Sequence, residues 1–85
     1  LLQARDYRGA IAVYTQGIEA QQEFEPAAVA ALYGNRAASH VMILGYEQAI
    51  SDCDRAVELN PNFANAVFRK AMALKKLVRT DGREN

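Results

Sequence analysis

The sequence predicts an all-α protein, on two observations of composition and one of spacing. Sixteen of the 85 residues are Ala, the strongest helix former, whereas Val, Ile and Thr together number only twelve. Apolar residues recur three and four positions apart through most of the chain, which is the spacing of one helix face. A chain of this length forms one small domain or part of one, and buries only roughly 60% of its unfolded surface.

Four helices joined by short turns account for the pattern. They are expected over Tyr7–Ala20, Ala27–Leu44, Tyr46–Leu59 and Phe63–Val78. Leu1–Arg5 fits the stub of a fifth helix, which gives about four to five helices in all. Residues 79–85 are polar and are expected to form a frayed tail, so the predicted domain covers residues 1–78.

The spacing of apolar residues, together with Pro and Gly residues that begin or end helices, supports each predicted helix in turn. The first helix carries a stripe of apolar residues at Tyr7, Ala10, Ile11, Tyr14 and Ile18. Pro26 suits the first position of the second helix, and Gly45 is expected to end that helix as a C-cap. The third helix has the stripe Ala49, Ile50, Cys53, Ala56 and Val57. Pro61 cannot continue it, so a turn at Asn60-Pro61-Asn62 leads into the fourth helix.

The sequence repeats internally, and the repeat predicts how the helices are arranged. Asn35-Arg36-Ala37 in the second helix aligns with Arg69-Lys70-Ala71 in the fourth at a spacing of ~34 residues. Tyr7 in the first helix aligns with Tyr46 in the third at a longer spacing, and the extra residues fit the loop around Gln21–Pro26. A helical period of ~34 residues is typical of tetratricopeptide repeats.

The residues that carry this resemblance lie in the middle of the chain. They are Tyr33, Ala37, Ala49, Ala56 and Pro61. The chain resembles the tetratricopeptide repeat family over residues 1 to about 78, with one complete repeat flanked by partial repeats. The resemblance implies a solenoid of antiparallel helix pairs, in which small Ala residues let paired helices approach closely. Ala37, Ala49, Ala56 and Ala71 are the residues expected at these close crossings.

The sequence offers little for catalysis or metal binding. His40 and Cys53 are the only histidine and cysteine, and they lie on different predicted helices, where packing roles are expected for both. Asp52 and Asp54 are interpreted as part of a solvated face. A structural zinc site needs four ligands, and the scattered glycines form no phosphate-binding loop. We therefore expect a protein that is not an enzyme and that uses neither a cofactor nor a metal.

The charges and the single cysteine limit the classes of partner. Net charge is zero and the pI is about 6.8, which argues against nucleic acid although the fourth helix is locally basic. No run approaches the ~18 apolar residues of a membrane span, so no membrane partner is expected. A lone cysteine suits a reducing compartment, which favours a cytoplasmic location.

One face of the second and fourth helices is the expected binding surface. In a solenoid of helix pairs the first helix of each pair lines the concave side. Here that side is formed by Ala31, Gly34, Asn35, Ala38 and Met42, and by Asn65, Phe68, Arg69, Met72 and Lys76. It combines small residues with an amide, a guanidinium, an aromatic ring and methionines, which suits recognition of an extended peptide.

The two aligned runs resemble the tetratricopeptide subclass found in chaperone adaptors. In that subclass a carboxylate clamp holds the acidic C-terminal tail of the seventy- and ninety-kilodalton heat-shock chaperones. Asn35 and Arg69 match two clamp positions, whereas Asn65 stands where the clamp usually has Lys. The other two clamp positions belong to a helix that this chain lacks.

Two functions follow as hypotheses. The first is a non-enzymatic module that binds an extended peptide, such as an acidic chaperone tail, in a concave groove. The second is a structural scaffold that self-associates or packs on other domains. Leu74, Leu77 and Val78 are expected to be uncovered on the side where a next helix packs, and uncovered apolar surface favours self-association.

Overall fold

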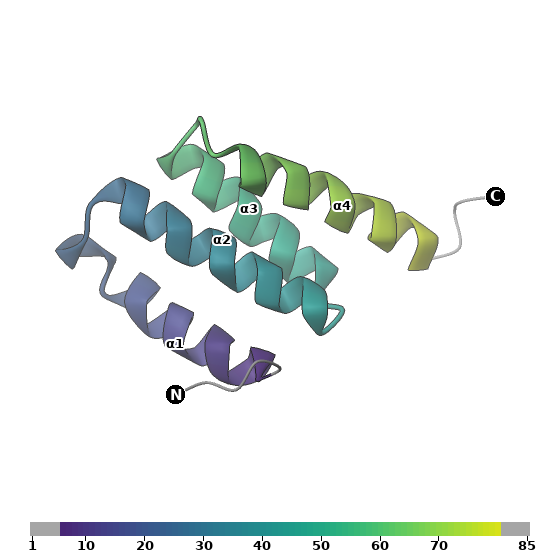
Figure 1. Ribbon diagram of the computed structural model, residues 1–85, viewed down its shortest axis with the longest axis horizontal. Coiled ribbons are helices and arrows are strands. Elements are labelled where there is room, and N and C mark those ends of the chain that lie inside the picture. Colours follow the sequence, from purple (N-terminus) through teal and green to yellow (C-terminus); the bar gives the residue numbers. More distant parts are fainter. Residues whose placement is uncertain (1–5, 81–85) are drawn as a thin grey trace.

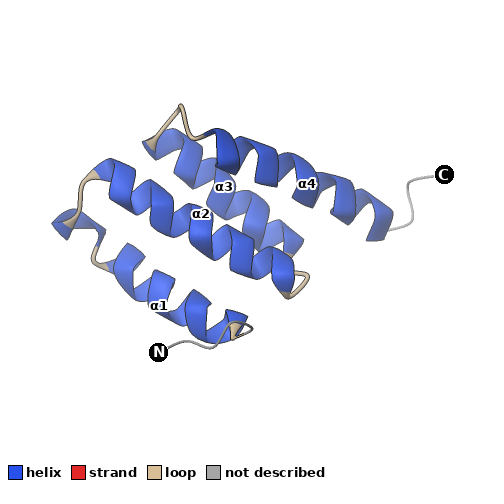
Figure 2. Ribbon diagram, viewed as in Figure 1, coloured by secondary structure: helices blue, strands red, loops and turns tan. Residues whose placement is uncertain are grey.

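The computed structural model describes residues 6–80, and within this range it is helical without strands (Figures 1 and 2). The elements are α1 (Tyr7–Glu19), a short 3-10 turn η1 (Gln21–Glu23), α2 (Pro26–Met42), α3 (Tyr46–Leu59) and α4 (Ala64–Thr80). The all-α prediction is confirmed, and each predicted helix is present to within two residues at either end. The predicted stub Leu1–Arg5 and the tail beyond residue 80 lie outside the described residues.

The first residues of α1 and α2 follow known preferences for helix starts. Asp6 precedes α1, and its carboxylate accepts a hydrogen bond from the backbone N–H of Gly9 at 2.9 Å. Pro26 is the first residue of α2, as predicted. α4 continues to Thr80, so Arg79 belongs to the helix although it was expected in the tail.

The end of α2 differs from the prediction. Leu44, and not Gly45, has the positive φ of a left-handed cap, at 68°. The N–H of Leu44 donates to the carbonyl of Val41 at 3.0 Å, and the N–H of Gly45 donates to the carbonyl of His40 at 2.7 Å. These two bonds form a Schellman motif, in which Gly45 is one residue beyond the left-handed position. Glycine is suited there by space, because a Cβ would lie 3.3 Å from the His40 ring.

The strain at Leu44 leads to a prediction about stability. Leu44 is exposed and makes little contact that a glycine would lose. A left-handed conformation costs a non-glycine residue roughly 1–2 kcal/mol, part of which is offset by the greater entropy of glycine in the unfolded chain. Leu44→Gly should therefore raise the free energy of unfolding by about 0.5–1 kcal/mol. Urea denaturation should show this gain, and Ile43→Gly, at a residue with negative φ, should instead lower stability.

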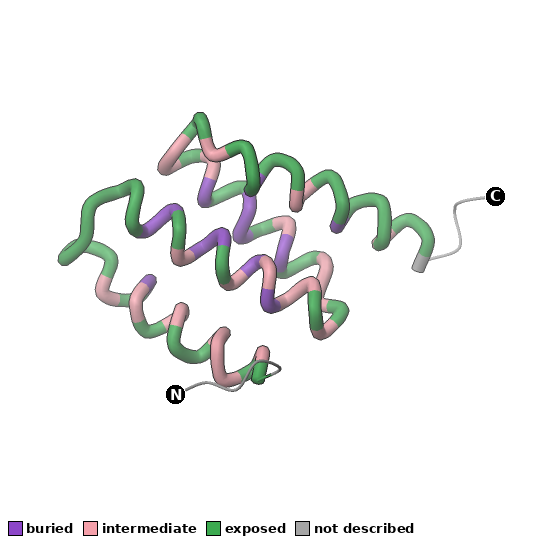
Figure 3. Tube along the Cα trace, in the orientation of Figure 1, coloured by how far each residue is buried: buried purple, intermediate pink, exposed green. Residues whose placement is uncertain are grey.

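Successive helices pack against one another, and α4 also contacts α2 (Figure 1). Buried residues lie along the facing sides of α2 and α3 (Figure 3). The fully buried positions are occupied by small side chains: Ala30, Ala37, Ala49, Cys53, Ala56, Ala66 and Ala73. Small residues at these crossings let helix backbones approach closely, as the repeat predicted. None of the described helices is long and apolar enough to cross a membrane.

The prediction that Ala71 lies at a close crossing of two helices is wrong. Ala71 is exposed, whereas Ala37, its counterpart one repeat earlier, is fully buried against α3. No described helix packs on the corresponding side of α4. The residues of α4 that are buried are Ala66 and Ala73, on the side that faces α3. Leu74 and Val78 are exposed, as expected, and Leu77 is half-buried.

Candidate functional site

The residues expected to bind a peptide lie on α2 and α4. Asn35 is on α2, and the other five, Asn65, Phe68, Arg69, Met72 and Lys76, are on α4. Arg69 is half-buried and the remainder are exposed. Phe68 is 68% exposed, an unusual state for so large an apolar residue. Five of the six residues are therefore at the surface, and Arg69 is partly covered.

One contact joins α2 and α4 beside these residues. The Arg69 Nη1 atom donates a long hydrogen bond, 3.5 Å, to the backbone carbonyl of Gly34. Gly34 directly precedes Asn35, so the guanidinium reaches α2 next to the residue with which Arg69 aligns in the repeat. The glycine at this position leaves room for the ring of Phe63, which would lie 3.0 Å from a Cβ there. Arg69 thus reaches the residue that precedes its aligned position on α2.

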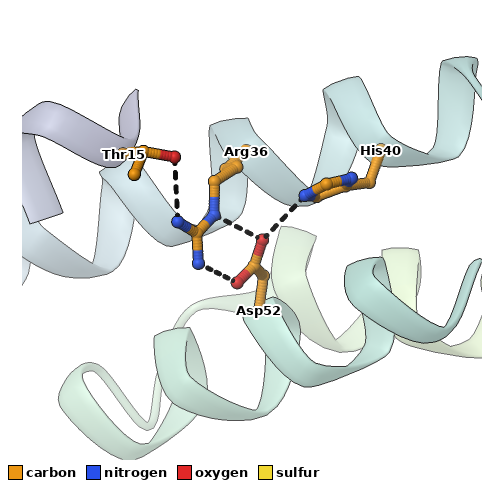
Figure 4. A network of polar contacts seen from close by, with 4 residues as sticks. All are labelled: Thr15, Arg36, His40 and Asp52. Carbon is orange, nitrogen blue, oxygen red and sulfur yellow. Dashed lines mark hydrogen bonds and ion pairs between the residues drawn. The ribbon is translucent and has the colours of Figure 1, made fainter. Parts of the chain in front are cut away.

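A buried polar network holds α1, α2 and α3 together (Figure 4). The Arg36 guanidinium donates two parallel hydrogen bonds to the Asp52 carboxylate, from Nε at 2.9 Å and from Nη2 at 2.7 Å. Its Nη1 donates to the hydroxyl of Thr15 at 3.1 Å. The Nε2 atom of His40 lies 3.9 Å from Asp52 Oδ2. Arg36 therefore connects three helices through a single side chain.

The protonation of the network follows from burial and charge. The hydrogen bond with Asp52 raises the pKa of Arg36, so its guanidinium stays charged in the folded protein. Burial lowers the pKa of His40, and this effect outweighs the attraction of the Asp52 carboxylate. His40 is therefore neutral at pH 7, and Asp52 is balanced by Arg36 rather than by the imidazole.

The interpretation of Asp52 as a solvated residue is wrong. Asp52 is only 4% exposed, because it lies between α2 and α3 where Arg36 neutralises it. Asp54, by contrast, is on the surface and pairs with Lys70 at 2.6 Å. A signal was present in the sequence: Asp52 is three residues after Ala49 and four before Ala56, and so lies on the buried stripe of the third helix.

Cys53 lies in an environment typical of a packing residue. Cys53 is fully buried, and burial raises the pKa of its thiol, which disfavours the reactive thiolate. His40 lies near Asp52, and burial lowers the pKa of its imidazole. Over the same residues, no three side chains of the metal-binding types are grouped together.

Comparison with known proteins gives relatives by sequence. No protein-family model and no solved structure matches the chain. The chain is 38% identical over 74 residues to a heat shock protein sti1 homolog of Schizosaccharomyces pombe. It is also 38% identical over 74 residues to the mitochondrial import receptor subunit TOM70 of Rattus norvegicus. Each of these alignments covers 87% of the chain and 12% of the relative.

A third relative has the tetratricopeptide repeat in its name. It is a DNA polymerase interacting, tetratricopeptide repeat-containing protein of 47 kDa from Drosophila melanogaster, 35% identical over 77 residues. That alignment covers 91% of the chain and 19% of the relative, so the chain spans less than a fifth of each of the three proteins. Three observations indicate the same family: the relatives, the internal repeat of the sequence, and the paired helices that cross at alanines. The chain belongs to the tetratricopeptide repeat family.

Proposed function

We propose that the chain is a non-enzymatic protein-interaction module that binds an extended peptide with an acidic C-terminus on the face shared by α2 and α4. The observation that carries the proposal is the position of Arg69, whose guanidinium reaches α2 beside Asn35. A guanidinium holds a carboxylate through two parallel hydrogen bonds, and the neighbouring amide of Asn35 supplies a further donor.

The surroundings of Arg69 fit a peptide that carries both charge and apolar side chains. Phe68 and Met72 lie on the same helix, exposed, four residues apart. Lys76 lies two turns beyond Arg69, where it meets an acidic side chain farther along the peptide. Two of the relatives are named as a receptor subunit and as an interacting protein, which supports a binding role.

The same face predicts weak binding. Asn65 provides an amide where the chaperone-adaptor subclass has Lys, so one positive charge is missing. We expect a dissociation constant of about 100 μM or weaker, which corresponds to about 5.5 kcal/mol. A dilute buffer should strengthen the interaction, because the contacts are exposed and salt screens them.

Titration of a short peptide with an acidic C-terminus, followed by calorimetry or NMR, tests the proposal. Arg69→Ala should weaken binding roughly 10- to 100-fold, since a hydrogen bond to a charged group contributes about 1.5–3 kcal/mol. Asn65→Lys should strengthen it by restoring a cation beside the ligand.

Two controls separate a specific site from general charge attraction. Arg8→Ala removes an exposed cation of α1, a helix that does not form this face, so it should change affinity less than twofold. The same peptide with an amidated C-terminus should bind more weakly than the free acid. Equal binding by wild type, Arg69→Ala and Asn65→Lys would show that this face is not the site.

A further inference from the structure

A stripe of apolar residues on α4 is uncovered in the described part of the chain. Its members are spaced as one helix face and all are exposed: Val67, Ala71, Leu74 and Val78. Moving back by one repeat places Val67 on Tyr33 and Ala71 on Ala37. Both of those residues are buried where α2 packs on α3. The stripe is therefore the face with which α4 would receive a helix of the α3 type.

At the opposite end of the structure, α1 has a side that is only partly covered. The alignment of α3 with α1 places the fully buried residues Ala49, Cys53 and Ala56 on Ala10, Tyr14 and Gly17. These three α1 residues are only half-buried. In α3 the same positions are covered by both α2 and α4, whereas the extensive packing of α1 among the described helices is against α2. α1 is therefore a helix of the α3 type with one open side.

We propose that a second copy of this chain packs its α1 on the exposed stripe of α4, so that the chains associate head to tail. The internal pair of α2 and α3 is the template for this contact. The interface joins two different surfaces, so it extends to longer assemblies unless the geometry closes a ring. The proposal does not depend on the peptide-binding function, because the stripe lies on a different side of α4 from Arg69.

At one pair of positions, the proposed contact differs from the packing of α2 on α3, and the residues on both helices differ together. In the template, His40 of α2 lies 3.9 Å from Asp52 of α3. The corresponding residues are Leu74 on α4 and Val13 on α1, which are 43% and 49% exposed. A polar contact is thus replaced by an apolar one, with both partners changed together. This correspondence is what favours a second copy as the occupant of the stripe.

The basic residue of α4 next to the stripe does not oppose the contact. Lys70 corresponds to Arg36, which needs the Asp52 carboxylate as its partner in the template. Lys70 already pairs with Asp54 of its own chain, at 2.6 Å. The proposed interface therefore buries apolar surface without leaving a cation there unpaired.

Complementation between two variants tests the proposal. Val13→Arg blocks the α1 surface and Leu74→Arg blocks the α4 surface, and both residues are exposed, so the fold should tolerate each change. Sedimentation equilibrium of the wild-type chain should show a mass that rises with concentration beyond that of a dimer. Each variant alone should remain a monomer. An equimolar mixture should form a dimer and nothing larger, because only one intact interface then remains between the two chains.

Controls and contrary outcomes are defined by the same measurement. Ala12→Arg changes an exposed residue of α1 that lies off the proposed surface, and should associate as wild type does. Circular dichroism should show equal helix content for all the variants. A mixture that remains monomeric overturns the proposal, as does a wild-type chain that is monomeric at high concentration. If Val13→Arg alone still dimerises, the contact is between two α4 stripes and the head-to-tail arrangement is wrong.

Discussion

Replacing Asp52 by alanine should lower the free energy of unfolding by about 3 kcal/mol, the largest loss expected from any single change in this chain. The substitution removes both hydrogen bonds that the Arg36 guanidinium donates to the carboxylate, and leaves the guanidinium between helices with only Thr15 as its described hydrogen-bond partner. The loss is placed at the low end for a broken buried pair because the Arg36 side chain keeps 21% of its exposure to water. Urea denaturation followed by circular dichroism measures it.

A double-mutant cycle separates the ion pair from the packing around it. Arg36→Met and Asp52→Leu should each be strongly destabilising, because each leaves one charge without its partner. The double variant should be more stable than the sum of the two losses predicts, since an apolar pair of similar volume can replace a buried ion pair. Losses that simply add would show that Arg36 and Asp52 contribute independently.

Asp54→Ala is the matched control for Asp52→Ala. Asp54 is also an aspartate of α3 and is also paired, with Lys70, but both of its pair's side chains are about half exposed. An exposed ion pair contributes only about 0–1 kcal/mol. The expected difference between the two aspartates is therefore a consequence of burial and not of ion pairing as such.

Helix positions were predictable from the sequence because they depend on local rules. Apolar spacing predicted all four helices, and Pro26 and Pro61 marked the boundaries where the structure has them. The internal repeat placed Arg69 in alignment with Asn35, and the structure brings Arg69 to the residue before it. A repeat gives pairing information of this kind because equivalent helices occupy equivalent places.

Three features could not be predicted because they depend on neighbours. Asp52 lies on the buried stripe of α3, but its burial also requires that Arg36 arrive from another helix to neutralise the carboxylate, which the spacing within one helix does not show. Ala71 fits a close-packed position, but is exposed because no described helix lies against it. Leu44 adopts the left-handed conformation at the end of α2 although Gly45 is the better residue for it, since the length of the turn fixes which residue occupies that position.

The close packing of the helices predicts the second large effect. Ala49 is fully buried in a cluster with Ala37, Cys53 and Ala73, so α2, α3 and α4 all meet at this residue. A leucine there adds three carbon atoms to a space that is already filled. Overpacking of this kind typically costs about 1–3 kcal/mol, and we expect Ala49→Leu to lower the free energy of unfolding by about 2–3 kcal/mol.

Two exposed alanines provide the comparison that makes this prediction specific to helix crossings. Ala28→Leu, near the start of α2, and Ala71→Leu, on the uncovered side of α4, add the same volume in the same type of helix. Because neither residue is buried in the described structure, each change should alter stability by less than about 0.5 kcal/mol. The three variants should be compared by urea denaturation at a concentration where the wild-type chain is monomeric, so that changes at Ala71 do not act through association.

If Ala71→Leu is as damaging as Ala49→Leu, α4 has a helix packed against it that the described residues do not include. If instead Ala49→Leu is as mild as Ala28→Leu, the helices do not cross closely at Ala49 and the alignment of α3 with its repeat is wrong.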